Sequence, residues 1–448
     1  MVSLGSIMNT SVSGMATYQT AIAVSSENVA NADADGYTRQ SVLIISGPEV
    51  ADVRRVYDTF CAKKVLESNE DQGRYETAAK YMAYVEAVFD ESSGYGISAS
   101  LNEFWNGWSE LVNDPSDMAA RADLVARAES LAGYINQAAL SLDDIQKEVE
   151  GEISNTVEEI NDLTAKIAAL NRDIAYAEAR GHNTNSLLDQ VESLTGQLAE
   201  LVDIQVQTND SGQVNVQLSG GRSLVSGSTS REMGTSIDAA TGLLNVTWQD
   251  GSGGEVDVTG QIKGGVLAGC LDVRDEYIAA YKQSLDDLAG TLINEVNALL
   301  LSGYDLNGSA GVELFLGAGA DDISVNPLIS DDPSLIAAGS AGPAVGDGTI
   351  AEGIAALSDA LLCGGGSSTM GDNYAALVTR VGSDVRSISD FSEYYAGLAD
   401  FYADCRESVS GVSLDEETAR LVLYQQGYEA CARVIEILQE IMDTAINM

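Results

Sequence analysis

The sequence contains a single histidine, and this shortage excludes most histidine-based chemistry. A catalytic triad that uses histidine can form at most once, and a metal site built from several histidines cannot form. His182 stands in the segment RGHNTNS, which interrupts a long stretch of helical periodicity. We therefore interpret His182 as an exposed loop residue and not as a general base.

Cysteine is scarce as well, and its distribution indicates no cross-linked framework. The cysteines are odd in number, widely spaced and without a C-x-x-C pair; they are Cys61, Cys270, Cys363, Cys405 and Cys431. This pattern is typical neither of a disulfide framework nor of a zinc site. We expect small, buried apolar side chains that are reduced in the cytoplasm during synthesis.

Long apolar runs and a secretory signal are also missing from the sequence. No stretch reaches the roughly 18 apolar residues that a membrane span needs. Residues 1–20 contain no Lys or Arg and no unbroken apolar run, so they do not resemble a signal peptide. The chain is expected either to stay in the cytoplasm or to leave it by a route that reads no cleavable signal.

Basic residues are few, and the resulting charge limits the partners of the chain. The 23 Lys+Arg stand against 68 Asp+Glu, a formal net charge of −45. A phosphate polymer or an anionic membrane would be repelled, so we predict no nucleic acid partner and no membrane insertion. Among so many acids a carboxylate pair suited to hydrolysis is uninformative, and three Trp and six Phe supply little for a sugar-stacking cleft. A secreted carboxylate-based hydrolase stays open as the alternative from a different class.

Short motifs give no reason to expect a catalytic, cofactor-binding or metal site. Asp305–Gly311 is similar to the start of a calcium loop, but Ala310 and Leu316 occupy the positions that need Gly and a bidentate Glu. A surface turn is expected there instead. The glycine clusters at 264–265 and 364–366 lack both the G-x-G-x-x-G pattern and the Gly-Lys-Ser/Thr ending of phosphate-binding loops.

What the sequence does contain is a heptad-like pattern at both ends. Residues 1–32 carry one charged side chain, Glu27, and their apolar residues recur every three or four positions: Leu4, Met8, Val12, Met15, Ile22 and Val29. A helix that begins near Ser413 repeats the pattern with Leu421, Tyr424, Tyr428, Ile435, Leu438 and Met442. Because lone terminal helices would fray, we predict that the two ends pair as a coiled coil and that these twelve residues form an assembly interface.

Between the ends the chain reads as mainly helical, with one region of strands. Helices are predicted over 50–90, from Pro115 to about 180, and over 186–202, 267–300, 350–362 and 372–408. Alternating apolar and polar residues, separated by Gly-rich turns, predict β-hairpins within residues 203–262. Residues 301–350 are predicted to form a loop. The expected fold is a mainly α, elongated multi-helix bundle with paired terminal coiled-coil helices and a small β-hairpin-rich part. Three parts are expected: a terminal coiled-coil domain (1–32 plus 409–448), a helical-bundle body (33–202 plus 263–408) and a β-hairpin-rich part (203–262).

Motifs at both ends carry a family resemblance. Asn28-Val29-Ala30-Asn31, followed by the turn at Gly36 and by Tyr37, Thr38, Arg39 and Gln40, resembles the N-terminal motif of flagellar rod, hook and hook-associated proteins. Residues 410–448 are similar to the C-terminal motif of the same family. The Gly-Tyr-Thr-Arg-Gln form and the internal segments 113–132, 185–202, 221–229, 264–269 and 303–315 are most similar to the FlgK family of hook-associated proteins.

The resemblance implies a structural role outside the cell and no enzymatic activity. FlgK-type proteins join the hook to the filament by self-assembly as the first proteins of the hook–filament junction, after type III export without a cleaved signal peptide. The implied partners are hook protein, hook-associated protein 3, further copies in a ring of the axial tube, and a cytoplasmic flagellar export chaperone that binds the C-terminal helix. Hook protein and hook-associated protein 3 remain alternatives within the class. Longer members carry a β-rich insertion for which residues 316–350 are too short.

Overall fold

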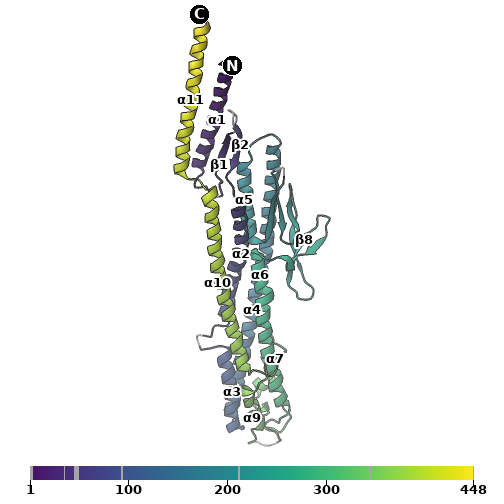
Figure 1. Ribbon diagram of the computed structural model, residues 1–448. Coiled ribbons are helices and arrows are strands. Elements are labelled where there is room, and N and C mark those ends of the chain that lie inside the picture. Colours follow the sequence, from purple (N-terminus) through teal and green to yellow (C-terminus); the bar gives the residue numbers. More distant parts are fainter. Residues whose placement is uncertain are drawn as a thin grey trace. The chain divides into compact units, whose positions relative to one another are not determined.

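The structure is a computed structural model that describes residues 4–34, 36–44, 50–91, 94–209, 212–342 and 346–446. The remaining positions, among them residues 1–3 of the predicted N-terminal helix, lie outside the described residues. Helices dominate the described chain (Figure 1). The larger helices are α1 Leu4–Ala30, α2 Thr59–Val88, α3 Ile97–Asn113, α4 Met118–Glu178, α5 Asn185–Leu201, α6 Gly265–Asp272, α7 Ala279–Leu301, α10 Met370–Ser410 and α11 Leu414–Ile446.

The strands form small antiparallel sheets. β1 Gln40–Ile44 pairs with β2 Val50–Arg55, and β10 Phe315–Leu316 pairs with β11 Ser324–Val325. A four-stranded sheet has the order β3-β4-β5-β6, and a three-stranded sheet has the order β7-β8-β9. Their bounds are β3 Ile204–Thr208, β4 Val214–Leu218, β5 Ser223–Ser226, β6 Thr229–Ser230, β7 Met233–Ile237, β8 Leu244–Gln249 and β9 Glu255–Asp257.

The chain divides into two compact units. Unit 1 comprises Met1–Arg74, Ser154–Ala268 and Glu393–Met448, and unit 2 comprises Tyr75–Ile153 and Gly269–Ser392. Helices α2, α4, α6 and α10 each contribute residues to both units. The boundaries between the two units differ from the boundaries of the three expected parts, because long helices run through the unit boundaries. The three-part organisation remains a prediction.

Unit 1 contains both terminal helices and the sheets of the β-hairpin-rich part. Helix α4 buries Ile160, Ile167 and Ile174 on one face, as its periodicity predicts. Two asparagines of α4 hold the sheets through paired backbone hydrogen bonds. The Asn171 amide donates to the Val214 carbonyl (2.7 Å) and accepts from the Val214 N–H (2.8 Å). Asn161 makes the same two bonds with Met233 at 2.8 Å each.

Unit 2 has an aromatic core of its own. The Phe104 and Trp108 rings from α3 lie edge to face with centroids 6.2 Å apart, and Phe315 packs on Phe104 at 5.6 Å. Buried Arg121 of α4 donates to the backbone carbonyls of Pro115 (2.8 Å) and Ile336 (2.7 Å). These bonds explain why an arginine is tolerated in the core of this unit.

Several predicted elements differ from the structure. Residues 50–55 form strand β2 and not helix, because they pair with Gln40–Ile44 in a hairpin that the sequence reading missed. Pro115 does not begin a helix: α4 starts at Met118, and the Asp117 carboxylate accepts the Ala119 N–H (2.8 Å) there. The predicted helix over 350–362 is shorter, with α9 at Thr349–Ala355 and a 3₁₀ turn at Ala356–Asp359.

The predicted surface turn at Asp305 is confirmed, since Asn307, Ser309 and Ala310 are exposed. Asp305 itself is buried, and its carboxylate accepts the N–H groups of Asn307 (2.9 Å) and Ser309 (2.7 Å). These bonds are typical of an Asx turn. Over the described ranges, no cluster of three or more His, Cys, Asp or Glu is arranged to hold a metal ion. Likewise, the helices within those ranges include none with the length and apolar character that a membrane span requires.

Candidate assembly site

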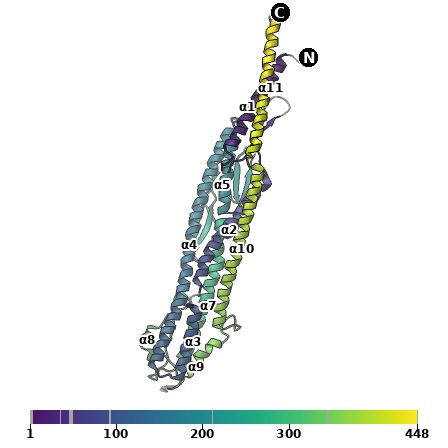
Figure 2. The ribbon, with the colours of Figure 1, turned by 90° about the vertical axis from the view of Figure 1, so that its left-hand side faces the viewer.

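The terminal helices pack against each other along most of α1. Tyr18 and Tyr424 have ring centroids 6.5 Å apart, and Gly14 lies beside the Cys431 sulfur. The residue numbers rise along α1 as they fall along α11, so the pair is antiparallel. Figures 1 and 2 both show α1 alongside α11, with the two chain ends at the same end of the pair. The predicted pairing of the termini is therefore present in the structure.

The two terminal helices bury different kinds of side chain. On α1 the buried residues are small or polar: Ser11, Thr17, Ala21, Val24, Ser25 and Asn28. The apolar residues predicted as the α1 seam lie at its border, where Leu4 and Val12 are exposed and Met8, Met15, Ile22 and Val29 are half-buried. On α11 Leu438 is buried, and Leu421, Tyr424, Tyr428, Ile435 and Met442 are half-buried. Their role as an assembly interface remains a prediction.

Two glycines allow the helices to approach closely. A Cβ atom added at Gly427 of α11 would lie 2.5 Å from the Tyr18 ring, inside any ordinary contact distance. A Cβ atom at Gly14 of α1 would lie 3.0 Å from the Cys431 sulfur. Small residues therefore bring the two backbones together, and packing rather than a wide apolar seam holds the pair.

The described residues of unit 1 leave a second face of α11 uncovered. Five large apolar residues are exposed along it: Val422, Leu423, Val434, Ile437 and Ile441. Helix α1 packs on the other side of α11, so these side chains form an apolar face that points away from the pair. We call these five residues the outer face of α11.

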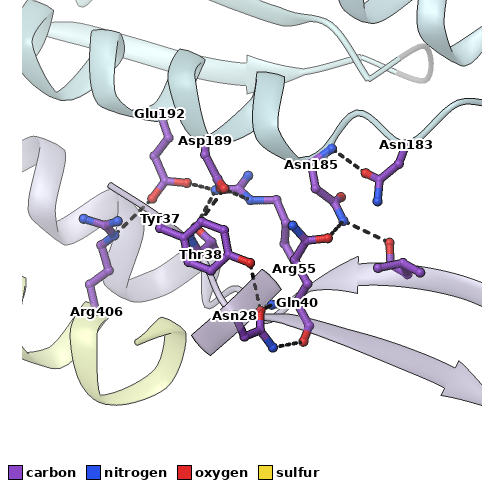
Figure 3. Close-up of polar contacts among 11 residues, drawn as sticks. Asn28, Tyr37, Thr38, Gln40, Arg55, Asn183, Asn185, Asp189, Glu192 and Arg406 are labelled. Carbon is purple, nitrogen blue, oxygen red and sulfur yellow. Dashed lines mark hydrogen bonds and ion pairs between the residues drawn. The ribbon is translucent and has the colours of Figure 1, made fainter. Parts of the chain in front are cut away.

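Asn28 is the centre of a polar cluster at the base of the terminal pair (Figure 3). Its amide is fully buried and donates to the Gln40 carbonyl (2.9 Å), and its carbonyl oxygen accepts the Gln40 N–H (2.9 Å). The same oxygen accepts the Tyr37 hydroxyl at 2.9 Å. Asn28 thus fixes the strand that follows the turn against the last turns of α1.

Helix α5 supplies the other half of the cluster from one helix face. Asn185 donates to the Gln40 side chain (2.9 Å) and to the Val53 carbonyl (3.1 Å), which joins α5 to both strands of the hairpin. Asp189 pairs with the Arg55 guanidinium at 2.7 Å and accepts the Thr38 N–H at 3.4 Å.

Arginines connect this cluster to the neighbouring helix ends. Arg55 pairs with Glu192 of α5, which also pairs with Arg406 of α10 at 3.2 Å (Figure 3). The Arg39 N–H donates to the Ser410 carbonyl (2.8 Å), and the Arg39 guanidinium pairs with Glu416 of α11 (3.3 Å). The motif therefore contacts the end of α10 and the start of α11.

Burial keeps the Tyr37 hydroxyl protonated. Desolvation and the nearby Glu27 carboxylate raise the pKa of Tyr37 to about 12. The Tyr37 hydroxyl therefore remains a hydrogen-bond donor to Asn28 across the physiological pH range.

The structure separates the predicted motif residues by role. Asn28, Tyr37, Thr38, Arg39 and Gln40 are brought together, whereas Asn31 donates only to the Glu27 carbonyl of its own helix end (2.9 Å). Gly36 has a φ of 76°, which confirms it as the turn residue.

Five members of the cluster were missed by sequence reasoning. They are Arg55, Asn185, Asp189, Glu192 and Arg406. A signal existed for three of them, because positions 185, 189 and 192 share one helix face of α5 and place polar side chains there. Arg55 and Arg406 lie in segments where the sequence offers no such pattern.

An open groove of about 1520 Å³ in unit 1 adjoins the cluster. Arg55, Asn185, Glu192 and the exposed His182 line it. The hydrolase alternative calls for converging acids and aromatic rings. Among the described lining residues Tyr57 is the one aromatic, and Glu192 is paired with two arginines. Asp52, Glu67, Glu70, Glu178 and Glu200 also line the groove, so carboxylates are present, but the groove has little aromatic surface on which a sugar ring could stack.

Comparison with known proteins first defines the class. Residues 8–38 match the family described as flagella basal body rod protein, and residues 407–448 match flagellar basal body rod FlgEFG protein C-terminal. These two segments contain most of α1, all of α11 and three residues of the polar cluster, Asn28, Tyr37 and Thr38. The ends of the chain are thus those of flagellar axial proteins.

The middle of the chain defines the family within that class. Residues 82–315, more than half of the chain, match the family described as flagellar hook-associated protein FlgK helical domain. The chain belongs to the FlgK family of flagellar hook-associated proteins, a family of structural proteins. This assignment decides against hook protein and hook-associated protein 3 as alternatives.

Similar proteins agree with this assignment. Flagellar hook-associated protein 1 of Bacillus subtilis is 26% identical over 98% of this chain and 97% of its own length. The protein of the same name from Escherichia coli is 23% identical over 99% of this chain and its full length. The latter alignment has 547 positions for a chain of 448 residues, so the relative contains segments without a counterpart here.

A solved structure shares the fold. The flagellar hook junction protein FlgK from Burkholderia pseudomallei superposes with a TM-score of 0.70 at 17% identity, covering 77% of this chain and all of that chain. The mainly α fold with long terminal helices and small antiparallel sheets is thus the fold of a known FlgK structure.

Proposed function

We propose that the protein is a structural component of the hook–filament junction of the bacterial flagellum and joins hook to filament by self-assembly. The observation that carries the proposal is the antiparallel pair of terminal helices with the outer face of α11 left exposed. It stands in a chain whose ends and body both match flagellar families.

The outer face of α11 is the surface we assign to contacts between subunits. Fully burying a large aliphatic side chain is worth roughly 1.5–3 kcal/mol. Five such side chains from each copy would supply a substantial part of the association energy in a closed ring. The polar cluster supports this role, since it fixes the base of the terminal pair to α5 and α10 by buried hydrogen bonds and ion pairs.

The neighbours in this proposal are the other axial proteins of the flagellum. Copies of the chain form a ring in the axial tube, with hook protein on one side and hook-associated protein 3 on the other. Before assembly a cytoplasmic export chaperone covers the C-terminal helix, whose exposed apolar residues would otherwise associate non-specifically. The protein reaches the outside through the flagellar type III apparatus without a cleaved signal peptide.

The proposed role is mechanical and needs neither catalysis nor a cofactor. The ring adapts a flexible hook to a stiffer filament, and its properties follow from packing between subunits. His182 is exposed and stands outside the polar cluster. A His182→Ala variant should therefore retain motility.

Electron microscopy of flagella from a strain that lacks the gene tests the proposal. We expect hooks without filaments and filament subunits released into the medium, with both defects restored by the wild-type gene. Full-length filaments on normal hooks in the deletion strain would contradict the proposed function.

A further inference from the structure

The four-stranded sheet of unit 1 has an open edge at β3. This strand stands at the end of the order β3-β4-β5-β6, so among the described strands it pairs with β4 alone. All five residues of β3, Ile204–Thr208, line the open groove of unit 1. An edge of this kind is a template on which another extended chain can pair.

The register of the β3–β4 pair shows which backbone groups of β3 point to the open edge. In an antiparallel pair, successive residues alternate between bonding across the pair and pointing away from it. The Asn209 N–H, next after β3, donates to the carbonyl opposite it in the hairpin (2.9 Å), so the odd-numbered residues bond toward β4. The Ile204 N–H agrees with this, because it donates to Glu70 of α2 (2.9 Å). The N–H and C=O groups of Val206 and Thr208 therefore also point to the open edge.

A carboxylate stands at each end of β3. Glu70 accepts the N–H of Ile204, the first residue of the strand. Glu178 of α4 lies beside the turn that follows the strand, since a Cβ atom added at Gly212 would be 3.8 Å from its Oε1 atom. Both carboxylates line the groove, so they mark the two ends of the open edge.

The cations of the groove leave these two carboxylates unpaired. The lysine and arginine side chains that line it pair with other acids: Arg54 with Asp52, Arg55 and Arg406 with Glu192, and Lys63 with Glu67. Within the described ranges Glu70 and Glu178 are thus left without an ion pair. They provide negative charge for which the groove itself supplies no counterpart.

We propose that the open edge of β3 binds an extended, basic peptide segment of another protein, which adds to the sheet as a further strand. Main-chain hydrogen bonds to β3 supply the affinity in this mode of binding, and side-chain pockets supply the specificity. The groove is lined by the half-buried Leu66, Leu188 and Val206, which can contact alternate apolar side chains of the segment. Basic side chains near its two ends pair with Glu70 and Glu178.

Charge favours a different protein over a second copy of this chain as the occupant. The chain has a formal net charge of −45, so two copies repel each other. Its other edge strands, β6, β7 and β9, contain no lysine or arginine, and β9 carries Glu255 and Asp257. The inference does not depend on the proposed assembly role, because it rests only on β3 and the groove.

Peptide binding to the purified full-length protein tests this inference. The probe is a fluorescent peptide of alternating valine and threonine with a lysine at each end. One comparison peptide has glutamate at the ends, and another has proline at its centre, where it cannot donate a main-chain hydrogen bond. We expect fluorescence anisotropy to report binding of the lysine peptide alone, weaker at higher salt, and hydrogen exchange to slow within residues 204–208.

Variants of the protein make the result specific. Val206→Pro removes one N–H from the open edge and no bond to β4, a position at which a strand tolerates proline. It should weaken binding of the lysine peptide about tenfold. Glu178→Gln should weaken it about two- to fivefold, whereas Glu158→Gln, at another exposed position of α4, should leave it unchanged.

Several results would overturn the proposal. They are no binding of the lysine peptide at millimolar concentration, equal binding of the glutamate or proline peptide, slowed exchange only outside residues 204–208, and unchanged affinity in Val206→Pro. Circular dichroism shows whether Val206→Pro folds, and if it does not, Glu178→Gln and the proline peptide decide the outcome. These measurements are independent of the deletion phenotype, so failure of one proposal leaves the other standing.

Discussion

At the scale of single residues, Asn28 does what no other residue type could do at its position. Its amide presents a donor and an acceptor to the backbone of Gln40 in the manner of a neighbouring strand, and it accepts the Tyr37 hydroxyl as well. Replacement by an apolar residue of similar size would leave three buried polar groups without a partner. Each such group costs about 1–3 kcal/mol.

The first prediction therefore concerns Asn28→Leu. We expect the free energy of unfolding of the variant to fall by about 3 kcal/mol or more. Hydrogen exchange should show lost protection at Gln40. The control is Asn31→Ala in the same motif, because Asn31 bonds only within its own helix end. If the two variants lose stability equally, the polar cluster does not have the role assigned to Asn28.

Glu70 of α2 is a half-buried acid whose charge opposes folding. Its carboxylate accepts the Ile204 N–H at 2.9 Å. Burial, together with the nearby acids Asp203, Asp71 and Glu67, raises the pKa of Glu70 to about 8 from its ordinary value of 4.5. The folded protein therefore binds a proton that the unfolded chain loses between pH 4.5 and 8. Stability from this group is fully present below pH 4.5 and is lost as the pH rises through 8.

The second prediction follows from this loss of stability with rising pH. Glu70→Gln keeps an acceptor for the Ile204 N–H and removes the charge, so the variant should be more stable than the wild type at pH 9 by about 1–2 kcal/mol. The difference should shrink as the pH falls toward 5. Urea unfolding at several pH values measures it, with the exposed Glu158→Gln as control. A difference that does not change with pH would show that Glu70 ionises normally.

At this scale the sequence predicted the motif residues but not their partners. Family resemblance marked Asn28 and Gln40, whereas Arg55 and Arg406 reach the cluster through a hairpin and a helix end that no local pattern reveals. Long-range ion pairs depend on tertiary packing, so spacing along the chain carries no information about them.

At the scale of elements, the terminal pair shows which helix contacts apolar periodicity predicts and which it does not. The three-and-four spacing predicts both helices, and it predicts the face of α11 that turns toward α1. On α1 the predicted seam residues are half-buried or exposed, while the buried positions carry mainly small or polar side chains, Ser11, Thr17, Ala21, Ser25 and Asn28 among them. Apolar periodicity finds wide stripes and overlooks contacts made by Gly, Ala and Ser.

The third prediction tests this close approach with a matched pair of glycines. Gly427→Ala would place a Cβ atom against the Tyr18 ring, whereas a Cβ atom at Gly397 of α10 meets nothing within 4 Å. Gly397→Ala should stabilise its helix by about 0.5–1 kcal/mol. Gly427→Ala should lose that gain and weaken the protection of α1 amides against hydrogen exchange. Stronger protection of α1 in Gly427→Ala would contradict the packing described for the pair.

At the scale of the whole molecule, the acidic composition is compatible with the proposed assembly. The net charge of −45 opposes non-specific association, while the exposed apolar residues of α11 remain available for specific contacts. The mainly α fold and the hairpins within residues 203–262 were predictable from periodicity, whereas the β1–β2 hairpin was not. The division into two units was not, because α2, α4 and α10 continue through the boundaries without a break in pattern.

The central claim is that the outer face of α11 joins subunits in the flagellum, and Ile437→Asp tests it most directly. Ile437 and Leu361 are both 56% exposed, Ile437 on α11 and Leu361 in unit 2, so Leu361→Asp is a matched control. Both purified variants should unfold within about 1 °C of the wild type, since neither side chain is buried in the isolated protein. In cells, Ile437→Asp should be missing from the hook tip, leaving hooks without filaments, and Leu361→Asp should assemble normally. Flagella of normal number and length in the Ile437→Asp strain would contradict the account.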